Sequence, residues 1–208
     1  MSDLVFHQEV FDVFEIEGLD QRMPAIQKRV QPVFRKYGHH LAEFIKEELD
    51  LDQAPPVHVA KHLQRKKHAP ENTWVAIGGD KRGYKRYPHF EIGINSDYVL
   101  VTLALLDKVD RKAEIASYLA EHSQDLRTLP EDFVMIPDHM ALDYFPLKEV
   151  DVDQMTDRLQ KVKKAECMLG RVAKSGNQVL EDETLLGQWL ITTVKPLLKT
   201  YQALIEED

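Results

Sequence analysis

The chain has 208 residues, of which 43% are hydrophobic and 30% charged, and its formal net charge is -8. A chain of this length can bury roughly 70% of its unfolded surface as one domain, residues 1–208, so it needs no stabilising disulfide. The acidic balance argues against nucleic-acid binding over the whole surface but allows a local site.

Cysteine usage and apolar runs bear on the cellular compartment. The one cysteine, Cys167, cannot form an intramolecular disulfide and is expected in the core. The N-terminus lacks the pattern of a signal peptide, and the longest apolar run, residues 99–106, is far shorter than the roughly 18 residues that span a bilayer. We therefore expect a cytoplasmic protein that does not enter the membrane.

The N-terminal part of the chain is predicted to be helical. Apolar residues between positions 23 and 49 recur at three- and four-residue spacing, and Asp20 stands where a helix N-cap would. Pro32 and Gly38 disfavour an unbroken helix, so two consecutive helices are the alternative. Further helices are predicted at residues 110–123, 153–165 and 183–206, and Pro196 is expected to bend or divide the last one.

Strands are predicted in the middle of the chain. Period-two alternation of β-branched and aromatic residues marks 57–62, 73–78, 88–95 and 98–106, and the turn residues 95–97 join the last two in a hairpin. Shorter strands are predicted at 133–136, 142–147 and 167–172. Because the strands cluster instead of alternating with helices, the sequence predicts an α+β fold, with a mainly antiparallel sheet packed against several amphipathic helices in a single domain.

Side chains alternate between the two faces of a strand, so each face can be assigned a chemistry. One predicted face is apolar and packs under helices. The other is expected to face solvent, and it collects His58, His62, Trp74, His89, Glu91, Tyr98 and Thr102. A solvated sheet face needs no function. Histidine and tryptophan are nevertheless unusual solvating residues, which favours a binding face for planar or anionic ligands.

Positive charge is concentrated in the same part of this acidic chain. Residues 57–90 contain eight lysines and arginines against two acidic residues. If the connections at 63–72 and 79–87 meet at the second face, they form a positive rim that attracts anions. Solvated loops, edge protection or a protein contact are the alternatives. Glycines 78, 79 and 83 match neither a P-loop nor a dinucleotide fingerprint.

The leading hypothesis is a binding module for an anionic ligand: a phosphorylated metabolite, a nucleotide or single-stranded nucleic acid. Its expected phosphate contacts are Lys81, Arg82, Lys85 and Arg86, with Trp74 or Tyr84 for stacking and His58, His62 and His89 for hydrogen bonds beside Glu91. One alternative is an enzyme that uses His89 and Glu91 as acid and base on an anionic substrate. Another is a protein-interaction module whose acidic helices meet a partner.

A metal site is not predicted. His58 and His62 are four residues apart, which on a strand separates them by about 13 Å, too far to share an ion. His39-His40 and Asp138-His139 come without a convincing set of partner ligands. The sequence identifies no cofactor.

Several motifs in order resemble a known family. The runs "HVAKH" (58–62), "TWVA" (73–76), "KRGYK" (81–85) and "PHFEIGI" (88–94), together with "FEIEGLDQRM" (14–23) and "LQKVKKAE" (159–166), are similar to the YktB-like family of uncharacterised bacterial proteins. The resemblance implies a cytosolic α+β protein of one domain. It assigns no role to any residue.

Overall fold

The computed structural model describes residues 4–63, 65–141 and 143–206. Its centre is a seven-stranded sheet in the order β1-β2-β3-β4-β7-β5-β6, in which every neighbouring pair is antiparallel. The strands are β1 Val57–Val59, β2 Asn72–Gly78, β3 His89–Asn95, β4 Tyr98–Leu105, β5 Val134–Ile136, β6 Phe145–Pro146 and β7 Cys167–Lys174. This arrangement confirms the predicted α+β fold with an antiparallel sheet.

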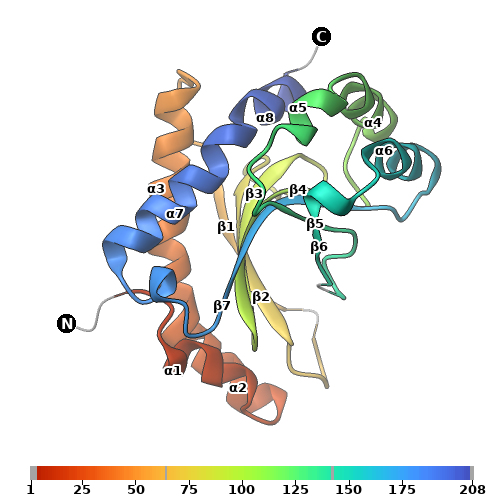
Figure 1. Cartoon of the computed structure of the whole chain (residues 1–208). Helices are drawn as coiled ribbons and strands as arrows, with labels where there is room; N and C mark the ends of the chain where they lie inside the picture. Colours follow the sequence, from red (N-terminus) through yellow and green to blue (C-terminus); the bar gives the residue numbers. More distant parts are fainter. Residues whose placement is uncertain (1–3, 64, 142, 207–208) are drawn as a thin grey trace.

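The helices lie mainly on one side of the sheet and around one of its ends (Figure 1). Helices α3 and α7 contact each other and cover the face of β1, β2, β4 and β7 that we call the first face. Helices α4 and α6 pack together, with α5 against both. The bounds are α1 Gln8–Phe11, α2 Leu19–Ala25, α3 Gln31–Glu48, α4 Lys112–Glu121, α5 Ser123–Arg127, α6 Val152–Lys161, α7 Glu183–Val194 and α8 Leu198–Ile205.

The predicted helical region from residue 20 to 49 is continuous but not uniform. A π-helical segment, Ile26–Val30, joins α2 to α3, and Pro32 follows it as the second residue of α3. The assignment of Asp20 as N-cap is wrong: Gly18, with φ of 81°, holds that position and Asp20 lies in the first turn. Gly38 does not break α3. The helix approaches the sheet closely at this residue, where a Cβ would lie 2.9 Å from Val57 Cγ1.

The other predicted elements differ from the structure mostly at their ends. Strand pairing of β1 stops at Val59, and the φ of His62 is 51°, so the chain turns before the predicted end at residue 62. The predicted strand at 142–147 is reduced to Phe145–Pro146, and residue 142 lies outside the described residues. The helix predicted at 183–206 is divided by a 3-10 turn, Lys195–Leu197, which contains Pro196.

The main core lies between the first face and its helices. It contains Val75, Ile77, Phe90, Ile92 and Val101, all 0% exposed, and the free thiol of Cys167, also buried as expected. Burial raises the pKa of that thiol to about 12. Among the described residues, no helix combines the length and apolar character that a membrane crossing requires.

The second face, the opposite side of the same strands, is not the solvated surface that alternation predicts. His89 and Thr102 are 0% exposed and Glu91 is 4% exposed. A second apolar cluster around Leu100, Ile136 and Met168 covers part of this face, and Tyr84 and Tyr144 pack against it. The expectation was wrong because β7 and β5 extend the sheet beyond β4, which leaves β3 and β4 central and lets later segments cover them.

Candidate functional site

Cross-strand pairing brings the predicted polar residues of the second face into adjacent rows. His58 pairs with Ala76, Ala76 with Glu91, and Glu91 with Thr102, so one row crosses four strands. His89 lies in the next row on the same face, because it is two residues from Glu91 on β3. These residues form the floor of the candidate site.

Tyr84 connects this floor to the basic loop, which we define as residues 79–87. Its ring lies 4.9 Å from that of His89 and 5.6 Å from that of His58, measured between centroids. Its hydroxyl accepts a hydrogen bond of 2.7 Å from Trp74 Nε1. Burial raises the pKa of Tyr84 to about 12. The basic loop therefore folds over the second face through one aromatic side chain.

His62 lies close to charged residues from both connections, 63–72 and 79–87. Its ring contacts Trp74 at 5.4 Å, and its Nε2 lies 3.0 Å from Thr73 Oγ1. Burial, followed by the positive charges of Arg65 and Lys85, lowers the pKa of His62 to about 4. Arg65 comes from the first connection and Lys85 from the basic loop. Both charges thus lie close enough to bear on one imidazole.

The four basic residues of the loop differ in their surroundings. Lys81, Arg82, Lys85 and Arg86 are all exposed. Arg86 pairs with Asp110 at 2.9 Å, whereas the other three form no ion pair with any described residue. A pocket of about 480 Å³ lies at this loop, lined by residues 80 and 82–87. Tyr84 lines this pocket, and its ring contacts His58 and His89 of the floor.

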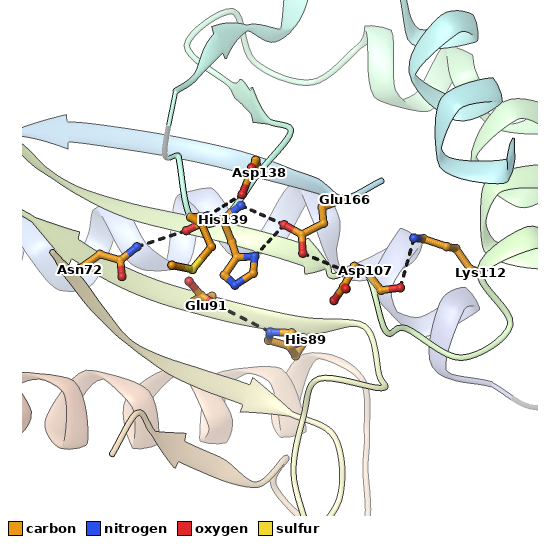
Figure 2. A network of polar contacts seen from close by, with 9 residues as sticks. Asn72, His89, Glu91, Asp107, Lys112, Asp138, His139 and Glu166 are labelled. Atoms are coloured by element: carbon orange, nitrogen blue, oxygen red, sulfur yellow. Dashed lines mark hydrogen bonds and ion pairs between the residues drawn. The ribbon is translucent and has the colours of Figure 1, made fainter. Parts of the chain in front are cut away.

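The floor contains polar atoms without hydrogen-bond partners. Within the described part of the chain, His58 Nε2, His89 Nε2 and Thr102 Oγ1 are buried and unpartnered. His89 Nε2 lies 3.7 Å from Glu91 Oε2 (Figure 2), and His89 Nδ1 lies 2.8 Å from the carbonyl oxygen of Tyr87. Buried polar groups are normally hydrogen-bonded, so these exceptions mark the floor as unusual.

A further histidine joins the site from a loop. His139 Nδ1 lies 2.7 Å from Glu166 Oε2, which also accepts 2.9 Å from the His139 backbone N–H (Figure 2). Glu166 Oε1 accepts from the Asp107 backbone at 3.1 Å, and Asn72 Nδ2 donates to the His139 carbonyl at 3.2 Å. The His139 ring lies 6.3 Å from that of Trp74. These bonds hold the 137–141 segment against the second face.

These contacts explain the pKa shifts of His139 and Glu166. The hydrogen bond to Glu166 raises the pKa of His139. Burial alone would raise the pKa of Glu166, but the hydrogen bonds from His139 outweigh it and the pKa lies below its ordinary value. The expectation that Asp138-His139 lacks partners was wrong. Local spacing could not reveal this pairing, because Glu166 stands 27 residues beyond His139 in the sequence.

The same group is the one place where described side chains approach a metal-ligand arrangement. One atom each of Asp138, His139 and Glu166 lie within 4.8 Å of one another. The Glu166 oxygens already accept hydrogen bonds, and Asp138 Oδ1 accepts from the Met140 N–H at 2.8 Å. The cluster therefore has a sufficient structural role in holding the loop.

The fold defines an α+β protein whose central strands are covered on both faces. A family model described as "Domain of unknown function (DUF1054)" matches residues 6–201. UPF0637 protein OB1420 of Oceanobacillus iheyensis is 36% identical over 201 residues, covering 97% of each chain. The UPF0637 protein of Enterococcus faecalis is 34% identical over 204 residues, covering 98% of this chain and all of the relative. UPF0637 protein YsbB of Lactococcus lactis is 38% identical over 203 residues, covering 97% and 100%.

The chain belongs to this family of uncharacterised bacterial proteins. The match confirms the YktB-like resemblance of the sequence motifs and spans nearly the whole chain. The names of the family and of these relatives mention no ligand or reaction.

Proposed function

We propose that this protein binds a small anionic ligand, with its charged group at the basic loop and its remainder over the second face. The observation that carries the proposal is the pocket of about 480 Å³ at the basic loop, which is lined by the cations Arg82 and Lys85. Neither cation forms an ion pair with a carboxylate in the described ranges. Uncompensated positive charge beside buried polar groups is the electrostatic arrangement that attracts and orients an anion.

The dimensions favour a phosphorylated metabolite or a nucleotide over a nucleic-acid strand. The pocket of about 480 Å³ falls within the usual range for small-molecule sites. Beyond it the chain is strongly acidic, which would repel a long polyanion. Such metabolites are cytoplasmic compounds and Cys167 is a free buried thiol, so the proposal places the protein in the cytoplasm.

The residues of the site take distinct roles in this proposal. Lys85 and Arg65 hold the anionic group, with Lys81 and Arg82 at the outer edge. Arg86 instead anchors the loop, since Asp110 accepts hydrogen bonds from two of its nitrogens at 3.0 and 3.1 Å. Trp74 and Tyr84 offer ring surfaces whose orientation is fixed by the bond between them.

Ligand binding should be visible at His62. Adenosine 5′-monophosphate and inorganic phosphate would be titrated into the protein while the His62 ring is followed by NMR across pH. A bound phosphate offsets the two cations, so the His62 pKa should rise above about 4, while the larger lowering caused by burial remains. The affinity, measured by calorimetry, should fall as salt is added.

Lys85→Gln supplies the matched variant. It should weaken binding of adenosine 5′-monophosphate by about ten- to a hundredfold, because a charge-assisted contact contributes about 1.5–3 kcal/mol. Lys148→Gln is the control, since Lys148 is equally exposed and forms no ion pair in the part of the chain that the structure describes. Equal loss in both variants, or affinity that ignores salt, would contradict the proposal.

Acid–base catalysis by His89 and Glu91 is a second candidate function. It is favoured by their 3.7 Å approach and by the Tyr87 carbonyl that orients the imidazole through Nδ1. Turnover of a phosphorylated substrate should then depend on pH and be lost in His89→Asn, with the thermal unfolding temperature of that variant near that of the wild type. A variant that retains turnover excludes this role.

A further inference from the structure

The floor of the site is built from hydrogen-bond acceptors that lack donors. His89 Nδ1 faces the Tyr87 carbonyl at 2.8 Å, and a carbonyl oxygen can only accept. The proton of the neutral ring therefore sits on Nδ1, which leaves Nε2 as a bare acceptor. This Nε2 is buried and has no partner in the described ranges.

Glu91 is the second acceptor. Its side chain is 5% exposed, and no described residue donates a hydrogen bond to its carboxylate. His89 Nε2 is 3.7 Å from Glu91 Oε2, which exceeds the length of a hydrogen bond. Two acceptors thus face one another, an arrangement that is unfavourable unless a donor lies between them.

The neighbours of this pair are small on the strand side and aromatic on the side of the basic loop. The cross-strand neighbours on β2 are small, since Ala76 stands opposite Glu91 and Gly78 opposite His89. His58 of the floor and the neighbouring rings of Trp74 and Tyr84 are only partly buried, so this side of the polar cluster reaches the surface. Tyr84 also lines the basic pocket. A ligand seated in that pocket would contact Tyr84, whose ring lies 4.9 Å from that of His89.

The polarity of the site reverses from its rim to its floor. Lys85 at the rim and Glu91 at the floor both act electrostatically on His139, in opposite directions. Figure 2 shows the His139 ring on the same side of the sheet as the Glu91 and His89 side chains. A cation at one end and a carboxylate at the other match a molecule with complementary groups at its two ends.

From this arrangement we infer that the ligand carries an amino, amidino or ammonium nitrogen on the same molecule as its anionic group. One nitrogen with two N–H bonds can donate to His89 Nε2 and to the Glu91 carboxylate together, at about 2.9 Å each. The inference rests on the proposed function, because the anionic group seats the ligand. It adds which second group the ligand must bear.

Matched pairs of phosphorylated probes test it. Adenosine 5′-monophosphate would be compared with purine riboside 5′-monophosphate, which lacks the 6-amino group. O-phosphoethanolamine would be compared with ethylene glycol monophosphate, in which a hydroxyl replaces the ammonium. In at least one pair the nitrogen-bearing member should bind at least tenfold more tightly by calorimetry, since without its two N–H donors at least one of the two acceptors is left unpaired.

Glu91→Gln is the diagnostic variant because it keeps the shape and removes the charge. It should abolish the preference within the discriminating pair, whereas Glu149→Gln, at an exposed position, should leave the preference intact. If the amino and non-amino probes bind equally but Lys85→Gln still weakens both, the inference fails and the proposed function stands. If no probe binds, the proposed function fails with it.

A second measurement addresses the free protein directly. Long-range ¹H–¹⁵N correlation spectra report which imidazole nitrogens carry a proton. At pH 7.5 the His89 Nε2 should be unprotonated in the free protein and should shift when the amino-bearing probe binds. A proton on both nitrogens of His89 in the free protein would overturn the inference, because His89 and Glu91 would then form a complete ion pair.

Discussion

The unpartnered hydroxyl of Thr102 leads to a prediction that runs against the usual effect of a core substitution. Thr102 is 0% exposed at the centre of β4, and its Oγ1 has no hydrogen-bond partner among the described residues. A buried polar group left unpaired costs about 1–3 kcal/mol. Thr102→Val has nearly the same shape and removes the hydroxyl, so it should raise the free energy of unfolding by about 1 kcal/mol.

A second buried threonine provides the control. Thr193 is also 0% exposed, but its Oγ1 donates to the Trp189 carbonyl at 2.7 Å. Thr193→Val loses that bond and should lower the free energy of unfolding by about 1 kcal/mol. The two substitutions are chemically identical at equal burial, so the sign of each effect depends on whether the hydroxyl has a partner.

Urea unfolding followed by circular dichroism measures both variants. The midpoint should rise for Thr102→Val and fall for Thr193→Val at unchanged slope, which means that the surface exposed on unfolding is the same. In thermal unfolding, 1 kcal/mol corresponds to about 2–4 °C for a chain of this size. A loss of stability in Thr102→Val comparable to that of the control would refute the reasoning.

The remaining predictions concern the titratable groups around the second face. Glu166→Gln should lower the free energy of unfolding by about 3 kcal/mol in urea titrations, because a buried carboxylate that accepts three hydrogen bonds is lost. The exposed Glu149→Gln is the control and should have almost no effect. Similar results for both variants would exclude the role of Glu166 in holding the loop. The folded pKa of His62, about 4, lies below its value of 6.5 in the unfolded chain, so the unfolded chain takes up the proton first and stability is lost as the pH falls from 6.5 toward 4. The loss should be on the order of 2 kcal/mol after allowance for solvent screening. It should be absent in His62→Asn, and a stability difference between the two proteins that stays constant from pH 7 to pH 4.5 would contradict this assignment.

The fold was predictable wherever a segment carries its own pattern. Strands β2, β3 and β4 lie within one residue of the predicted 73–78, 88–95 and 98–106, because their alternation is strict and their turns are short. Strand β6, with two residues, is too short to show a period. The start of α2 was misplaced because glycine at an N-cap leaves no side-chain signal, whereas Asp20 nearby resembles one.

The candidate site was predictable only in part. Residues on one strand could be assigned to a common face, which placed His89 with Glu91. Alternation says nothing about what covers a face, so the burial of these side chains was missed. Contacts between distant segments were missed for the same reason, including the pairing of His139 with Glu166 and of Arg86 with Asp110. Such pairs depend on the order of strands in the sheet, and local spacing does not contain that order.

The two faces of strands β3 and β4 can be compared residue by residue. Ile92 and Val101 on the first face and Thr102 on the second are all 0% exposed, and Glu91 is only 4% exposed. Apolar side chains, such as those of the first face, stabilise a buried position more than polar side chains do. Buried polar groups without hydrogen-bond partners lower the stability of the fold. Selection for the fold would therefore remove the carboxylate and the hydroxyl. Their presence on the face that adjoins the basic loop is accounted for if they contact something other than the protein, and we therefore propose the binding function for that face.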